Sequence, residues 1–105
     1  MKIDKITEKY QLYKDGASYV IDFGETKRAE DKTVEIEITA IEEAGLLKLS
    51  ETCGCVSVQK TLYDSNRAGF KINYSNCDSP FNQTVVVFYN NKQLTTILLT
   101  GRCSQ

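Results

Sequence analysis

Four cysteines offer the most obvious chemistry in this 105-residue chain: Cys53, Cys55, Cys77 and Cys103. Cys53 and Cys55 flank a single glycine, and side chains two positions apart on a β-strand point to the same face. We therefore expect two sulfur atoms side by side, with Cys103 in the last predicted strand and Cys77 in a predicted loop, either of which can reach them. Such a set of sulfurs permits free thiols, disulfides or a metal site.

We favour buried free thiols that pack as small apolar side chains. The second arrangement is a disulfide that joins Cys53 or Cys55 to Cys77 or Cys103, although such bonds are rare in a reducing compartment. A direct Cys53–Cys55 bond is disfavoured, because neighbouring same-face Cα atoms on a strand lie near the outer limit of disulfide reach. The third arrangement is zinc bound by all four thiolates, but structural zinc sites usually space their paired cysteines two to four residues apart.

Catalytic side chains are scarce. The chain contains no histidine, which removes the most common general base and the usual activator of a serine or cysteine nucleophile. Cys55 does not belong to a Cys-x-x-Cys pair at a helix start, which would lower its pKa. The acidic pairs Glu30-Asp31 and Glu42-Glu43 fall in predicted loops. We therefore predict no catalytic residues, no cofactor and no enzymatic activity.

The overall charge and hydropathy exclude further classes. Charged residues make up 26% of the chain and the net charge is −1, so no basic face is available to bind nucleic acid. No apolar run approaches the roughly 20 residues that span a bilayer. Residues 1–6 lack the apolar segment of a signal peptide, so we expect synthesis and retention in a reducing cytoplasm.

Alternating apolar and polar residues predict β-strands along most of the chain. In Thr33–Thr39, the clearest case, Val34, Ile36 and Ile38 share one face. The nearly continuous apolar run in Thr84–Tyr89 predicts a central strand that is covered on both faces. About seven such segments at intervals of roughly 8–12 residues predict an all-β fold, an antiparallel sandwich of two sheets.

The turns and the ends of the pattern define the domain organisation. Asn90-Asn91 separates two strands and tolerates positive φ, so it predicts a tight hairpin of the primed type. Residues 1–15 are interpreted as an N-terminal arm or an extra strand, and residues 16–105 as one sandwich domain.

A longer pattern runs through residues 19–103. Its parts are Phe23-Gly24, Leu47-x-Leu49 before Cys53-Gly54-Cys55, Gly69-x-Lys71-x-Asn73-Tyr74, and a last strand that ends in Leu99-Thr100-Gly101. This pattern resembles the DUF1573 family, whose members are short immunoglobulin-like β-sandwich domains related to MSP and ASH-type modules. The resemblance implies an immunoglobulin-like two-sheet sandwich of about seven strands and supplies no enzymatic role.

In layout, the chain is also similar to the immunoglobulin-like auxiliary proteins of tailed-phage virions. That likeness implies a structural protein, made in the host cytoplasm, that docks on a capsid or another virion protein. Tyr10, Tyr13 and Tyr63 lie in or beside predicted loops, and tyrosine is enriched at protein interfaces. They are therefore the predicted partner-binding residues.

Two other functions remain open. One is a DUF1573-type module that recognises a protein or a glycan in the cell envelope, if a leader was removed. The other is a thiol redox or zinc-binding protein built on the cysteines.

Overall fold

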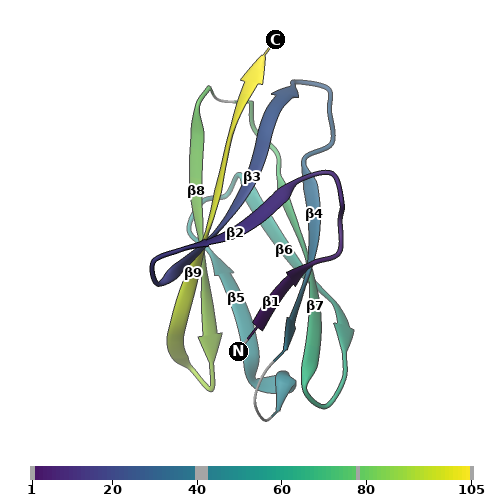
Figure 1. The fold of residues 1–105 in the computed structure, drawn as a ribbon, viewed down its shortest axis with the longest axis vertical. Helices are drawn as coiled ribbons and strands as arrows, with labels where there is room; N and C mark the ends of the chain where they lie inside the picture. The colour runs from purple at the N-terminus through teal and green to yellow at the C-terminus, as the bar shows by residue number, and fades with distance from the viewer. Residues whose placement is uncertain (1, 40–42, 78, 105) are drawn as a thin grey trace.

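Two β-sheets pack face to face as a sandwich in the computed structural model (Figure 1). The structure describes residues 2–39, 43–77 and 79–104, without the side chains of residues 62 and 63. The strands are β1 (Lys2–Lys5), β2 (Gln11–Asp15), β3 (Ser18–Lys27), β4 (Thr33–Thr39), β5 (Leu47–Glu51), β6 (Val56–Tyr63), β7 (Arg67–Tyr74), β8 (Phe81–Tyr89) and β9 (Lys92–Ser104). A turn of 3-10 helix, η1 (Ala44–Leu46), precedes β5.

The strand order confirms the prediction of an all-β sandwich of two sheets and corrects two of its details. One sheet has the order β1-β4-β7-β6 and the other has the order β2-β3-β9-β8-β5. The described residues therefore form nine strands rather than about seven. The expectation of a purely antiparallel sandwich is wrong, because β3 and β9 pair in parallel. No hairpin joins these two strands, because the chain forms β4 to β8, in both sheets, between them.

The first two strands lie at the edges of different sheets. β1 pairs with β4 in the four-stranded sheet, and β2 pairs with β3 in the five-stranded sheet. The connection between them therefore crosses from one sheet to the other, in front of the sandwich as Figure 1 shows it. Both strands are short, which is one way in which proteins keep sheet edges from pairing with other chains.

The core fills the space between the sheets. Val34, Ile36 and Ile38 of β4 are fully buried, as their alternation predicts. From the opposite sheet, Val85 and Val87 of β8 are also fully buried. Burial of this apolar surface supplies the main driving force for folding, at about 25 cal/mol for each Å² removed from water.

The hairpin between β8 and β9 has the predicted local geometry. Asn90 and Asn91 have φ values of 51° and 65°. Positive φ at both central residues is what a type I′ turn requires, and asparagine adopts it at low cost.

Gly101 on β9 lies where the backbone passes close to an aromatic ring. A Cβ atom added there would lie 2.7 Å from Cζ of Phe81 and 3.0 Å from the carbonyl oxygen of Gly24. Phe81 is buried and its ring stacks on Tyr74 with centroids 4.3 Å apart, so the ring has little room to move.

We predict that Gly101→Ala lowers the free energy of unfolding by about 1–3 kcal/mol, the usual cost of overpacking a core. Gly54→Ala is the matched control, because nothing lies within 4 Å of a Cβ atom at that position. Urea denaturation of both variants measures the difference. Equal stability of the two variants would contradict the close approach at Gly101.

Candidate functional site

The cysteines form two disulfides, Cys53–Cys55 and Cys77–Cys103. The expectation of buried free thiols is therefore wrong, and so is the expected pairing between the Cys-Gly-Cys segment and the other two cysteines. In both disulfides the Cα atoms are 5.2 Å apart, inside the usual range for such bonds.

The Cys-Gly-Cys segment lies in the loop between β5 and β6 and not in a strand. The strand-based argument against a direct bond therefore does not apply, because the loop turns here: the Val56 amide donates to the Cys53 carbonyl at 3.1 Å. The amide and the hydroxyl of Ser75 both donate to the Cys55 carbonyl, at 2.8 and 3.0 Å. Ser75 is two residues from Cys77, so the two disulfides occupy neighbouring loops at one end of the sandwich.

The disulfides change what the cysteines can do. A sulfur bonded to another sulfur is no thiolate, and only the thiolate attacks as a nucleophile or binds metal. Among the described residues, no group of three or more Cys, Asp or Glu side chains is arranged to hold a metal ion. In this structure the four cysteines are therefore covalent links between backbone segments.

The three predicted partner-binding tyrosines have different environments. Tyr10 is only 3% exposed, so its prediction as an accessible contact residue is wrong. Its ring packs on Phe23 at a centroid distance of 4.4 Å, and its hydroxyl donates to the Asp31 carbonyl at 3.0 Å. Tyr13 is 48% exposed. Tyr63 belongs to β6, and its side chain lies outside the described part of the structure.

Tyr10 is buried because the segment between β1 and β2 is fixed to the loop after β3. Lys9 donates a hydrogen bond of 2.6 Å to Glu30, and this bond lowers the pKa of the Glu30 carboxyl and raises that of the Lys9 amine. Burial raises the pKa of the Tyr10 hydroxyl, because the phenolate would lose its hydration.

The outer face of the four-stranded sheet is charged and internally paired. Lys71 of β7 lies 3.6 Å from Glu35 of β4, and Arg67 of β7 lies 3.7 Å from Glu37. These ion pairs join neighbouring strands on the solvent side. Exposed pairs of this kind contribute little stability, and they mark a face that is suited to water.

The outer face of the five-stranded sheet carries instead a diagonal row of apolar side chains. We call this row the apolar stripe: Tyr13, Val20, Leu98, Val86 and Phe88. Tyr13 is the cross-strand partner of Val20, Val20 is the partner of Leu98, and Val86 is one diagonal step from Leu98. Val20 is 4% exposed although it is not part of the core cluster. The stripe therefore crosses four strands on the side away from the core.

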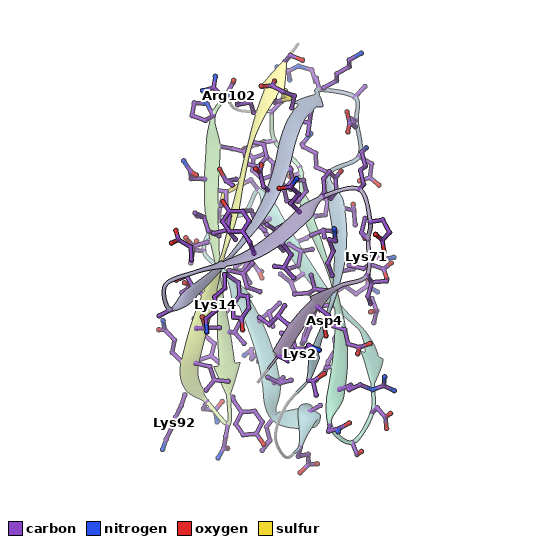
Figure 2. The ribbon with its side chains drawn as sticks, viewed as in Figure 1. Lys2, Asp4, Lys14, Lys71, Lys92 and Arg102 are labelled. Carbon is purple, nitrogen blue, oxygen red and sulfur yellow. A yellow bond between two sulfur atoms is a disulfide. The ribbon has the colours of Figure 1, made fainter. Side chains whose placement is uncertain are left out.

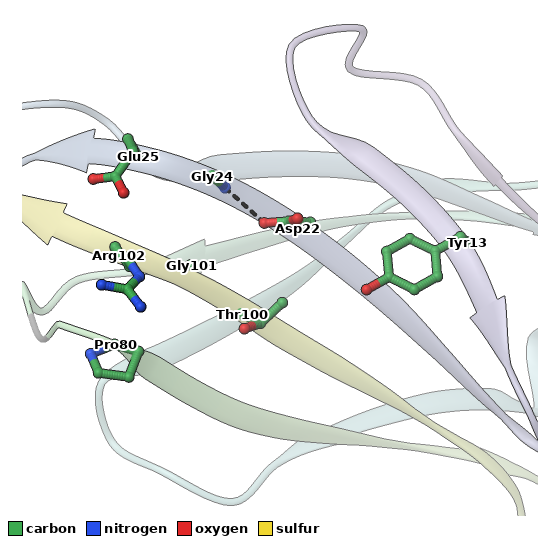
Figure 3. A pocket seen from close by; sticks show the side chains of 8 residues that line it. All are labelled: Tyr13, Asp22, Gly24, Glu25, Pro80, Thr100, Gly101 and Arg102. Atoms are coloured by element: carbon green, nitrogen blue, oxygen red, sulfur yellow. Dashed lines mark hydrogen bonds between the residues drawn. The ribbon is translucent and has the colours of Figure 1, made fainter.

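A shallow groove adjoins the stripe at Tyr13, with a volume of about 460 Å³ (Figure 3). We call it the Tyr13 groove; it is lined by Tyr13, Asp22, Gly24, Glu25, Pro80, Thr100, Gly101 and Arg102. It lies over β2, β3 and β9, with Pro80 at its side. Figure 2 labels Arg102 near one end of the sandwich and Lys92 at the opposite end.

Comparison with known proteins identifies no relative, so the fold and the site are interpreted from their geometry and chemistry. No family model, no curated protein and no solved structure matches the chain. The described part of the chain contains no helix with the length and hydrophobicity needed to cross a membrane.

Sequence reasoning missed most of the residues on this face. Of the apolar stripe, only Tyr13 was predicted as a contact residue. The apolar run in Thr84–Tyr89 was a usable signal, because it predicts cover on both faces of β8. β8 is a central strand, but the expectation that it is covered on both faces is wrong: the core covers one face, while Val86 and Phe88 on the other remain partly exposed. No comparable signal pointed to Arg102 or Glu25, which are ordinary charged residues in the sequence.

The buried hydroxyl of Tyr10 makes the stability of the fold depend on pH. The folded pKa of the Tyr10 hydroxyl is raised above the unfolded value of about 10. Its contribution to the free energy of unfolding is therefore fully present below about pH 10 and is lost as pH rises through the folded pKa. Tyr10→Phe should remove this part of the alkaline loss of stability and also lower stability at pH 7 by about 0.5–1.5 kcal/mol, through the lost hydrogen bond to Asp31. Urea denaturation between pH 7 and 11 measures both.

Tyr13→Phe is the control, because Tyr13 is exposed and its hydroxyl makes no hydrogen bond to a described residue. It should change stability at pH 7 by less than about 0.5 kcal/mol. If the two variants behave alike, the buried position of Tyr10 is wrong.

The two disulfides should contribute unequally to stability. The Cys77–Cys103 bond closes a separation of 26 residues and the Cys53–Cys55 bond one of 2 residues. Loop-closure entropy then assigns about 3.5 kcal/mol to the first bond and about 1.5 kcal/mol to the second. The double variant Cys77→Ala/Cys103→Ala should therefore lose more stability than Cys53→Ala/Cys55→Ala in urea denaturation.

The wild-type chain, alkylated without reductant and weighed by mass spectrometry, should carry no added groups. Four alkylated cysteines, or equal losses of stability in the two double variants, would contradict the assigned bonds.

Proposed function

We propose that the protein is a non-enzymatic docking module with immunoglobulin-like topology. The strand order supports this topology, because β1-β4-β7-β6 corresponds to the A-B-E-D sheet of immunoglobulin domains and β9-β8-β5 to the G-F-C strands. In this correspondence β3 is an additional strand beside β9, and β2 extends the same sheet by one further strand.

The contrast between the two outer faces carries the proposal. One face has cross-strand ion pairs, and the other has the apolar stripe, from Tyr13 on β2 to Phe88 on β8. A row of apolar side chains with a polar surround is typical of a protein-binding surface. Val20 is already covered at 4% exposure, whereas Tyr13, Leu98, Val86 and Phe88 keep part of their surface accessible, so we assign this face to a partner protein.

We propose a subunit of a larger protein shell as the occupant, with the module as an auxiliary component of a phage virion. The elongated body measures 44 × 23 × 22 Å, and its long side offers room for a standard interface of about 800 Å² per partner. The two disulfides agree with exposure on a virion surface, where such bonds persist. The assignment to a phage is an analogy of layout.

The second candidate is a DUF1573-type module of the cell envelope that recognises a protein or a glycan. The same two disulfides favour it, because the bacterial periplasm and the cell surface also preserve them. The two candidates differ in where the protein is found: in purified particles or in the envelope fraction of cells.

A charge placed in the apolar stripe tests whether it is the docking surface. Val86→Lys introduces a charge into the stripe on β8, and it should lower the occupancy of the module on its native particle at least tenfold, since a buried unpaired charge is costly. Gln59→Lys is the matched control: it adds the same charge at an exposed position on β6, in the other sheet. Quantitative mass spectrometry of purified particles reconstituted with each variant measures the occupancy.

Thermal unfolding checks that both variants fold. Wild-type occupancy by Val86→Lys would exclude the stripe as the docking surface. A wild-type chain that remains monomeric and never co-purifies with a larger assembly would exclude docking altogether.

A further inference from the structure

We propose that the Tyr13 groove is a binding subsite for a neutral saccharide. This inference goes beyond docking on a shell: it assigns to the groove a small polyhydroxylated ligand, and it depends on residues outside the apolar stripe except for Tyr13. The groove is the surface shown in Figure 3.

The first observation is a β-bulge that brings two carboxylates to one face. In a regular strand, residues three positions apart point to opposite faces. The register between β3 and β9 shifts between Asp22 and Glu25, where Gly24 has a φ of 65°. As a result, Asp22 stands beside Thr100 and Glu25 beside Arg102, and all four line the groove. Bulges that redirect side chains are frequent next to functional sites.

The second observation is that the polar groups of the groove are not used by the protein itself. Arg102, Glu25 and Thr100 make no side-chain hydrogen bond or ion pair with any described residue, although Glu25 and Arg102 are register partners. Asp22 accepts one bond, from the Gly24 amide at 2.8 Å, through one of its two carboxylate oxygens. Donors and acceptors therefore face the groove together and are available to a ligand.

The mixture of charges selects the class of ligand. A phosphate or sulfate would be repelled by the carboxylates of Asp22 and Glu25, and Arg102 offsets part of the attraction of these carboxylates for a cation. A hydroxyl group donates one hydrogen bond and also accepts. It can donate to a carboxylate while it accepts from the guanidinium, which has only donors. A neutral polyol is the ligand that satisfies both kinds of group.

The walls and floor of the groove favour a ring-shaped ligand. Tyr13 is 48% exposed. At one side of the groove, its ring offers an apolar surface with a hydroxyl at its tip. Gly24 lines the groove without a side chain, and nothing lies within 4 Å of a Cβ atom built there, so a sugar ring can approach the backbone closely at this point. The volume of about 460 Å³ lies in the range of small-ligand sites.

Titration of the isotope-labelled protein with neutral trisaccharides, followed by NMR, tests the proposal. The probes are maltotriose, cellotriose, chitotriose and mannotriose. At least one should shift the amide signals of Gly24, Thr100 and Arg102, with a Kd of about 1 mM or tighter. Arg102→Ala and Tyr13→Ala should each weaken that binding at least tenfold. Lys92→Ala should leave it unchanged, because Lys92 lies at the other end of the sandwich (Figure 2).

Three results would overturn the proposal: no shift with any of the four probes, binding that is unaffected by both groove variants, or tighter binding of a sulfated trisaccharide than of its neutral parent. The docking proposal is tested separately. Val86→Lys should keep saccharide binding while it loses docking, and Arg102→Ala should do the reverse.

Discussion

The parallel pairing of β3 with β9 is the contact on which the rest of this sandwich depends. It joins an early strand to the last one, from Tyr19 beside Ile97 to Lys27 beside Ser104. β2 belongs to the sheet only through β3, and β8 and β5 belong to it through β9. Partners this far apart in sequence must overcome a large loss of chain entropy before they meet, so we expect this pairing to limit the rate of folding.

The same pairing creates the candidate site. The extra residue at Gly24 is accommodated because β9 continues straight past it, with Gly101 leaving room for the Phe81 ring. The shift places two carboxylates of β3, those of Asp22 and Glu25, next to Thr100 and Arg102 of β9. The groove is thus a consequence of how one strand is offset against its neighbour. The apolar stripe depends on the same neighbours, because Val20 and Leu98 are adjacent only when β3 and β9 pair.

The disulfides restrain the end of the molecule at which β9 finishes. Cys77–Cys103 ties the loop between β7 and β8 to the end of β9, and Ser75 links that loop to the Cys-Gly-Cys turn. The outer face of the five-stranded sheet carries the apolar stripe and the Tyr13 groove, away from the ion-paired face. The proposed docking and the proposed saccharide subsite both lie there.

The sequence by itself determined the features that depend on near neighbours. The alternation of Val34, Ile36 and Ile38 predicted a strand with one buried face, since side-chain direction in a strand alternates with every residue. Asn90-Asn91 predicted the hairpin because asparagine readily adopts the positive φ that a two-residue type I′ turn requires, and this depends only on the turn itself.

Tertiary structure decided everything that depends on which distant segments meet. Tyr10 and Tyr13 have similar surroundings in the sequence. Tyr10 is buried where the chain crosses between the sheets, whereas Tyr13 is exposed. The cysteine partners could not be deduced from spacing, because the loop geometry that joins Cys53 to Cys55 is not a strand geometry. The groove required the offset between β3 and β9, and no local pattern encodes which strand becomes the neighbour of another.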